Sequence, residues 1–169
     1  MFACANPLSR GVILADEVGL GKTIEAGLVI SQRWAERRRR ILIIVPANLR
    51  KQWHQELQDK FNLQGVLLEA KSYNALRKQD RRNPFQGATG PVICSYQFAK
   101  AKADDIKAVE WDLVVLDEAY INFSRQRSLI PELTEYPNLV ILQTLSKAWG
   151  LAGLRIGMTF CSEQIIAIL

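Results

Sequence analysis

The stretch "DLVVLDEAYINF", residues 112–123, decides the fold, because its apolar run ends in the paired carboxylates of Asp117 and Glu118. A continuous apolar run of this kind predicts a strand that is buried on both faces of a parallel sheet. An aspartate at the end of such a strand suits two unrelated chemistries. One holds Mg²⁺ against a nucleotide, and the other holds the ring nitrogen of pyridoxal phosphate.

Similar apolar runs recur along the chain, and segments with helical spacing separate them. The predicted strands cover residues 11–15, 41–46, 66–70, 91–96, 112–119, 138–145 and 155–160. Helices are expected near residues 23–38, 47–61, 97–108, 128–137 and from 162 onward, with a short helix and then a loop in 73–90. This alternation predicts an α/β three-layer sandwich with a mostly parallel sheet, in a single domain over residues 1–169.

The composition is that of a globular domain, with 49% hydrophobic and 23% charged residues among 169. No apolar run reaches the ~18 residues that a membrane span requires, and residues 1–11 lack the features of a signal peptide. We therefore expect a cytoplasmic protein with no membrane partner. The three cysteines are far apart and His54 is the only histidine, which argues against a zinc site and against histidine-based catalysis.

Charge is distributed unevenly, with a net charge of +7 in residues 1–111 and −2 in residues 112–169. A basic part of this size suits a polyanion such as DNA, although a solvated surface has the same composition. The four arginines at 37–40 follow a predicted helix, whose dipole favours positive charge at that end. We interpret them as solvated, and we expect at most weak DNA binding through the basic part. The oligomeric state is not predicted.

The loop "DEVGLGKT", residues 16–23, joins the first predicted strand to the helix that follows it. A glycine-bearing loop in this position cradles phosphates, because its backbone N–H groups and the helix N-terminus face the anion. The glycines let the backbone approach, the lysine reaches the terminal phosphates, and the threonine hydroxyl reaches Mg²⁺. The candidate residues are Gly19, Gly21, Lys22 and Thr23. Asp16 stands where the usual pattern begins with glycine.

Four stretches between residues 11 and 119 resemble, in order, motifs of the Swi/Snf-type DNA-translocating ATPases of helicase superfamily two. They read "GVILADEVGLGKTIEAG", "ILIIVPANLRKQWHQEL", "VICSYQFAK" and "WDLVVLDEA". The resemblance implies a P-loop, RecA-like core that binds ATP with Mg²⁺, and an acidic residue at position 16 is common in that family. It assigns Mg²⁺ to Thr23 and Asp117, and it makes Glu118 the catalytic residue that orients and deprotonates the attacking water.

This resemblance ends after residue 119. Tyr120 stands where the ATPases have histidine, and the second RecA-like lobe with its arginine fingers does not appear in the sequence. An arginine finger is worth ~10³–10⁵ in rate. We therefore expect at best slow ATP hydrolysis and no translocation.

The stretch "LVVLDEAYINFSRQRSLIPELTEYPNLVILQTLSKAWGLAGLRIGMTF" instead resembles histidinol-phosphate aminotransferase, a fold-type I pyridoxal phosphate enzyme, over residues 113–169. The resemblance implies a Schiff base with the cofactor, a carboxylate on its pyridinium nitrogen, a hydrogen bond to its 3-oxygen and contacts to its phosphate. In that order these roles fall on Lys147, Asp117, Tyr120, and the pair Ser146 and Arg155, with Thr144 as a further phosphate contact. The cofactor cup of that family has no counterpart in residues 1–111, so transamination is not expected.

Two families therefore meet at one shared strand. We interpret the chain as a chimera, engineered or recombinant, with a P-loop ATPase-like part in 1–111, a shared strand in 112–119 and an aminotransferase-like part in 120–169. The strand at 138–145 is expected to lie between the strands at 112–119 and 11–15. Three functions follow as alternatives: a nucleotide-binding domain with weak or no ATPase activity, a pyridoxal phosphate-binding fragment, or a folded chimera that binds neither ligand.

Overall fold

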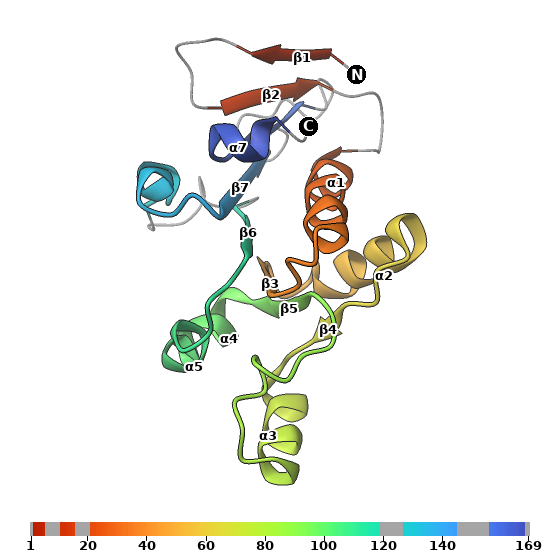
Figure 1. The fold of residues 1–169 in the computed structure, drawn as a ribbon, viewed down its shortest axis with the longest axis vertical. Coiled ribbons are helices and arrows are strands. Elements are labelled where there is room, and N and C mark those ends of the chain that lie inside the picture. Colours follow the sequence, from red (N-terminus) through yellow and green to blue (C-terminus); the bar gives the residue numbers. More distant parts are fainter. Residues whose placement is uncertain (1, 6–10, 16–20, 119–126, 145–155, 168–169) are drawn as a thin grey trace.

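The computed structural model of the chain describes residues 2–5, 11–15, 21–118, 127–144 and 156–167. Within these ranges the strands form one eight-stranded sheet in the order β1-β2-β8-β7-β6-β3-β5-β4 (Figure 1). The strands are β1 Phe2–Ala5, β2 Gly11–Ala15, β3 Ile41–Val45, β4 Val66–Leu67, β5 Val92–Ser95, β6 Leu113–Asp117, β7 Leu139–Thr144 and β8 Ile156–Phe160. The helices are α1 Gly21–Ala35, α2 Arg50–Phe61, α3 Ala70–Gln79, α4 Tyr96–Ala101, α5 Ala103–Lys107, the 3₁₀ helix η2 Ile130–Thr134 and α7 Glu163–Ile166.

The sheet is mostly parallel, as the alternation of strands and helices predicts. Strands β4, β5, β3, β6 and β7 pair in parallel with their neighbours. Strand β8 runs antiparallel to both β7 and β2, which turns β2 back into the common direction. The carboxyl ends of these six parallel-running strands therefore share one edge of the sheet.

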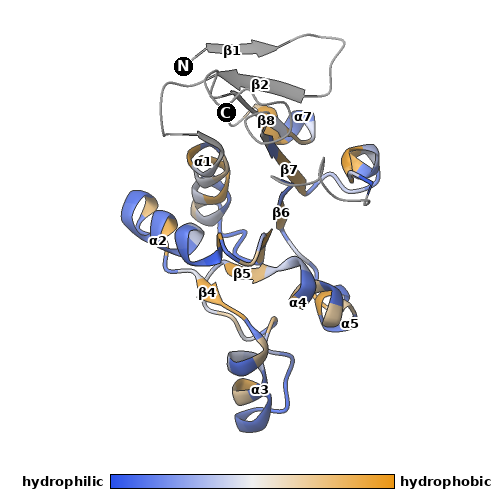
Figure 2. Cartoon of the chain, turned by 180° about the vertical axis from the view of Figure 1, so that it is seen from behind, coloured by the Kyte–Doolittle hydropathy of each residue, from blue (hydrophilic) through white to orange (hydrophobic). Residues whose placement is uncertain are grey.

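Apolar side chains pack on both faces of the sheet. Successive side chains of each central strand point to opposite faces, and both faces are covered. Ile41, Ile43 and Val45 of β3 belong to the cluster with α1, α2 and Ile165 of α7, whereas Leu42 packs with Tyr73, Phe85 and Phe98 on the other side. A third cluster joins Leu116, Leu139 and Ile141, with η2 residues against it. In Figure 2 the central strands are orange and the outward parts of α2 and α3 are blue, as expected for buried strands under amphipathic helices.

Local sequence signals account for the helix ends. Ser95 caps α4, because its Oγ accepts a hydrogen bond from the backbone N–H of Phe98 at 3.3 Å. Glu69 and Ser72 form a capping box at the start of α3. Asn62 ends α2 in the left-handed conformation with φ 52°, which asparagine tolerates better than most residues.

The sheet departs from the sequence-based expectation in two ways. Strand β7 lies next to β6, as expected, but it does not pair with β2, because β8 occupies the position between them. An antiparallel partner such as β8 can follow its neighbour directly, without the crossover that a parallel strand needs. In addition, the sequence did not predict β1, which pairs antiparallel with β2. No helix of the described residues is long and apolar enough to cross a membrane.

Candidate functional site

Asp117 ends β6 at the carboxyl edge of the sheet and is 3% exposed. Side chains alternate along a strand, and Leu113 and Val115 of β6 face the cluster formed with α1 and α2. Asp117 points the same way and meets α2, where Nε1 of Trp53 donates a hydrogen bond to its Oδ2 at 3.3 Å. The carboxylate is thus held on the face of the sheet that α1 and α2 cover.

Tyr96, the first residue of α4, holds the backbone of the same aspartate. Its hydroxyl donates a hydrogen bond to the carbonyl oxygen of Asp117. Burial raises the pKa of Tyr96, and the negative charges of Asp117 and Glu118 raise it further. The phenol therefore stays protonated at physiological pH and remains a hydrogen-bond donor.

Glu118 is equally buried, at 5% exposure, but it belongs to the other face of the sheet. Its carboxylate accepts three hydrogen bonds: from Ser128 Oγ at 2.7 Å, from the backbone N–H of Leu129 at 2.9 Å and from Gln143 Nε2 at 2.8 Å. All three donors come from residues 128–143. Asp117 and Glu118 are adjacent in the sequence, but their carboxylates therefore lie on opposite faces of the sheet and have different hydrogen-bond donors.

The start of α1 lies at the same edge of the sheet as Asp117. Glu25, in the second turn of α1, accepts a hydrogen bond from Thr159 Oγ1 of β8 at 2.9 Å. Thr159 is the register partner of Leu142 in β7, and Leu142 is the register partner of Asp117 in β6. Two strand spacings separate Thr159 from Asp117, or ~10 Å. The second turn of α1 therefore contacts the sheet two strands away from Asp117, near the same edge.

The structure locates only part of the predicted site. Gly21 and Lys22 open α1, Thr23 follows them and is half-buried, and Thr144 ends β7 at the same edge. The remaining candidates lie outside the described residues, so their roles stay predictions: Gly19, Tyr120, Ser146, Lys147 and Arg155.

The oxygen ligands at this edge fit Mg²⁺ held together with phosphates. Mg²⁺ is usually bound by one or two protein oxygens plus substrate phosphates and water, and seldom by a cage of protein ligands. Among the described residues, no group of three or more His, Cys, Asp or Glu side chains could hold a metal by itself. The buried carboxylate of Asp117 and the hydroxyl of Thr23 fit a site in which one or two protein oxygens bind Mg²⁺ together with phosphates and water.

Two hollows lined by described residues lie at the opposite edge of the sheet. One of about 470 Å³ is lined by Trp34, Thr89 and residues 62–66, which precede β4 and β5. The other, of about 390 Å³, is lined by Arg40, Gln86 and residues 108–110, which precede β3 and β6. Both open at the amino ends of parallel strands, whereas ligands in open α/β sheets bind at the carboxyl ends. We do not assign a site to them.

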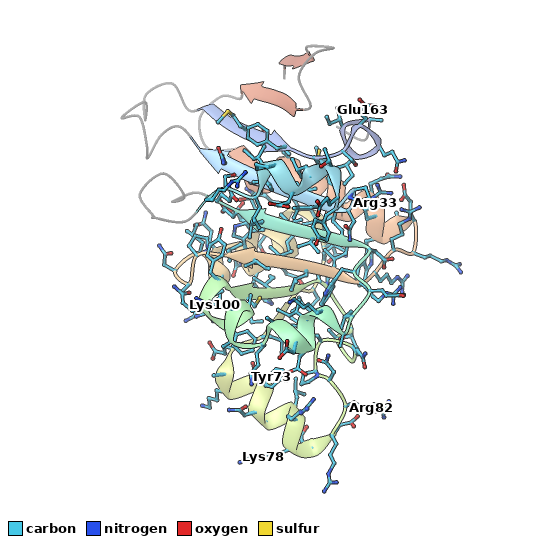
Figure 3. All side chains as sticks on the ribbon, turned by 90° about the vertical axis from the view of Figure 1, so that its left-hand side faces the viewer. Arg33, Tyr73, Lys78, Arg82, Lys100 and Glu163 are labelled. Atoms are coloured by element: carbon cyan, nitrogen blue, oxygen red, sulfur yellow. The ribbon has the colours of Figure 1, made fainter. Side chains whose placement is uncertain are left out.

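Helix α3 and the turn after it present a cluster of positive charge that is separate in sequence from the arginines at 37–40. Five basic residues fall between Lys71 and Arg82, all exposed, and Arg82 pairs with Asp80 at 2.9 Å. Figure 3 shows Lys78 and Arg82 at the far end of α3, with Tyr73 between the helix and the rest of the molecule. This surface is separate from the edge that holds Asp117.

Sequence reasoning missed the two aromatic donors to Asp117. Trp53 and Leu57 are four residues apart on one face of α2, and both are buried there. A buried tryptophan, however, also has an N–H group that needs an acceptor, and this requirement was the available signal. Nothing in the sequence indicates which carboxylate supplies the acceptor, because Trp53 and Asp117 are 64 residues apart.

Comparisons with known proteins find two families that match parts of the chain. The SNF2-related domain family matches residues 1–134, and aminotransferase class I and II matches residues 101–169. The two matches overlap in 101–134, around the strand that the sequence suggests they share.

Two of the curated relatives are RNA polymerase-associated proteins. RNA polymerase-associated protein RapA of Serratia proteamaculans is 41% identical over 150 residues, covering 82% of this chain and 15% of the relative. RapA of Pseudomonas syringae pv. tomato is 41% identical over 149 residues, covering 83% of this chain and 15% of the relative. The chain thus spans about 15% of the length of these curated relatives.

A solved structure gives the fold. L-Threonine-O-3-phosphate decarboxylase from Porphyromonas gingivalis superposes with a TM-score of 0.55 at 16% identity, over 94% of this chain and 46% of that chain. The similarity supports the α/β architecture described above.

Proposed function

Because the chain belongs to the SNF2-related domain family, we propose that it is a nucleotide-binding domain that holds ATP with Mg²⁺ at the carboxyl edge of its sheet. The observation that carries the proposal is the buried carboxylate of Asp117 at the end of β6, at the same edge as the first turns of α1.

In this proposal the backbone around Gly19 and Gly21 surrounds the phosphates, and Lys22 neutralises part of their charge. Thr23 and Asp117 supply oxygen ligands to Mg²⁺, which lowers the negative charge of the phosphates when it is bound. Transfer of a phosphoryl group depends mostly on such positioning and charge neutralisation. The few protein groups named here are therefore of the kind that this chemistry requires.

We expect slow hydrolysis or none. The family resemblance assigns the attacking water to Glu118, but this carboxylate accepts hydrogen bonds from Ser128, Leu129 and Gln143. A general base must lie within hydrogen-bond reach of the proton that it removes. A carboxylate whose acceptor sites are engaged inside the protein is poorly placed for that role.

Binding of a fluorescent ATP analogue to the 169-residue chain, with Mg²⁺ and with EDTA, tests the proposal. We expect Lys22→Ala to weaken binding at least about 10-fold, equivalent to about 1.4 kcal/mol. Lys78→Ala is the matched control, because Lys78 is an exposed lysine on α3. Absence of saturable binding by the unmodified chain, or equal binding by both variants, contradicts the proposal.

A pyridoxal phosphate site is the second candidate, and the aminotransferase match over residues 101–169 favours it. Asp117 and Lys147 both lie within that match, and Asp117 is the one of the two that the structure describes. When bound, pyridoxal phosphate supplies an electron sink. Absorbance of an imine that appears with the cofactor and is absent in Lys147→Ala would support this function in place of the first.

DNA is the proposed macromolecular partner. The exposed cations of α3 and the basic composition of residues 1–111 support weak contact with a phosphate backbone. Such contact weakens steeply with salt, because binding releases counterions from the DNA. An affinity for duplex DNA that does not change with salt concentration would contradict this proposal.

A further inference from the structure

The indole of Trp53 is built into the same site, although its sequence position suggests only a core residue. Trp53 is 2% exposed and belongs to the apolar cluster that includes Val115 of β6 and Leu57 of its own helix. This packing restricts the ring to one orientation. In that orientation its single N–H group points at Oδ2 of Asp117, at 3.3 Å.

Asp117 is held from both sides of the sheet. Trp53 reaches its carboxylate from α2, and Tyr96 reaches its backbone carbonyl from α4. Helices α2 and α4 pack in different clusters, on opposite faces of the sheet. Trp53 therefore restrains the rotation of the carboxylate, and Tyr96 restrains the position of the backbone.

The nature of the Trp53 donor matters for a cation site. An indole N–H is a neutral donor, so the hydrogen bond orients the carboxylate without cancelling its negative charge. A lysine or arginine in the same place would form an ion pair and compete with a metal ion. A neutral hydrogen-bond donor behind a carboxylate ligand is the arrangement by which outer groups orient metal ligands.

We propose that Trp53 is a positioning residue that orients the Asp117 carboxylate towards the Mg²⁺ of bound ATP, an inference that rests on the nucleotide site proposed above. Trp53 does not itself contact the nucleotide in this proposal. Its removal therefore weakens the part of nucleotide binding that depends on Mg²⁺. The part that depends on the phosphate loop alone is unchanged.

The test compares nucleotide affinity in excess Mg²⁺ with affinity in EDTA, using the fluorescent ATP analogue and the full 169-residue chain. In Trp53→Phe we expect the ratio of the two affinities to fall about 10-fold, the lower end of the effect of removing a group that orients a metal ligand. The affinity in EDTA should equal that of the unmodified chain. A general loss of folding would instead lower both affinities together.

Trp111→Phe is the matched control. Trp111 is a half-buried tryptophan whose Nε1 donates to the backbone oxygen of Ile106 at 2.9 Å, so this variant also loses one indole hydrogen bond. Its affinity ratio should be unchanged. A second variant at position 53 carries 3-benzothienylalanine, which keeps the shape of the indole but has sulfur in place of N–H. We expect this variant to lower the affinity ratio as Trp53→Phe does. Because it keeps the shape of the indole, it provides the test even if the phenylalanine variant folds poorly.

The outcomes separate this inference from the proposed function. If the unmodified chain binds no nucleotide with or without Mg²⁺, both are wrong. If it binds and the two variants at position 53 keep its affinity ratio, only the positioning role of Trp53 is wrong. Equal losses in Mg²⁺ and in EDTA would also overturn the positioning role, because they would assign Trp53 to packing alone.

Discussion

A carboxylate that is 5% exposed, as that of Glu118 is, is tolerated inside a protein only when hydrogen-bond donors replace the water that it has lost. Three donors do so here: a hydroxyl, a backbone N–H and an amide. Because two of them come from the segment that precedes η2 and the third from β7, the side chain ties that segment to the sheet. Glu118 thus has a structural role that its position after Asp117 does not suggest.

Replacing Glu118 with glutamine tests this role. The glutamine amide turns an N–H₂ group towards at least one donor, so a buried hydrogen bond is lost and a donor is left unsatisfied. We expect the free energy of unfolding, measured by urea denaturation, to fall by about 2–4 kcal/mol. Glu110→Gln is the control, because that side chain is 92% exposed, and a change beyond about 0.5 kcal/mol there would be unexpected. Equal stability of Glu118→Gln and the unmodified chain would show that the three hydrogen bonds contribute little.

Single residues were predictable where the chemistry is local. The pattern of the stretch at 112–123 placed Asp117 and Glu118 at the end of a buried strand, and the structure agrees. Alternation along the strand sends the two side chains to opposite faces, but the sequence could not show which partners they meet there, because those partners lie 10 to 64 residues away. The roles assigned to Lys22 and Lys147 remain predictions.

The strands were predicted well because their apolar patterns are local in the sequence. Seven runs were predicted as strands and all seven contain strands, with ends that shift by a few residues. Strand β1 was missed because "FACA" has neither alternation nor β-branched residues, and it forms only by pairing with β2. Helix α3 begins earlier than expected because the capping box of Glu69 and Ser72 sets its start.

Glycine at position 90 fixes the approach of β4 and β5 at the edge of the sheet. A Cβ added to Gly90 would lie 2.1 Å from the carbonyl oxygen of Gln64, a backbone atom that cannot move without shifting the start of β4. Gly90→Ala should therefore lower the free energy of unfolding by about 1–3 kcal/mol, as overpacking does. Urea denaturation followed by circular dichroism measures the change.

Gly87 supplies the control for this element. A Cβ added to Gly87 meets no atom within 4 Å, and alanine restricts the unfolded chain more than glycine does. Gly87→Ala should leave stability unchanged or raise it by up to about 1 kcal/mol. If both alanine variants have the stability of the unmodified chain, the close approach at Gly90 does not constrain the edge.

At the scale of the whole molecule, the fold class followed from the sequence but the strand order did not. Alternating strands and helices are local patterns, and they gave a mostly parallel α/β sheet correctly. The position of β8 between β7 and β2 depends instead on pairing with β2, a strand from the other end of the chain. The apolar pattern of "RIGMTF" is compatible with either direction and either neighbour, so no local signal distinguishes them.

Two buried thiols report on the two faces of this sheet. Cys94 of β5 packs in the cluster with Tyr73 and Phe98, whereas Cys161, just after β8, packs in the cluster with Val140 and Ile165. Burial raises the pKa of each thiol from 9.0 to about 12, an effect that the positive charge of Arg50 partly offsets at Cys94. One thiol therefore lies in the SNF2-related part, and the other lies where only the aminotransferase family matches.

Stability should consequently fall as the pH rises from about 9 towards 12. In that range the unfolded chain releases the thiol protons while the folded chain keeps them, so the unfolded state binds fewer protons and gains stability relative to the folded one. Each thiol contributes a slope of at most about 1.4 kcal/mol per pH unit. Urea denaturation at several pH values should give a smaller slope in both Cys94→Ala and Cys161→Ala.

If the two families form one cooperative unit, both substitutions change the slope of the same single transition. Two transitions, each sensitive to only one of the cysteines, would mean that the halves fold separately on a shared strand.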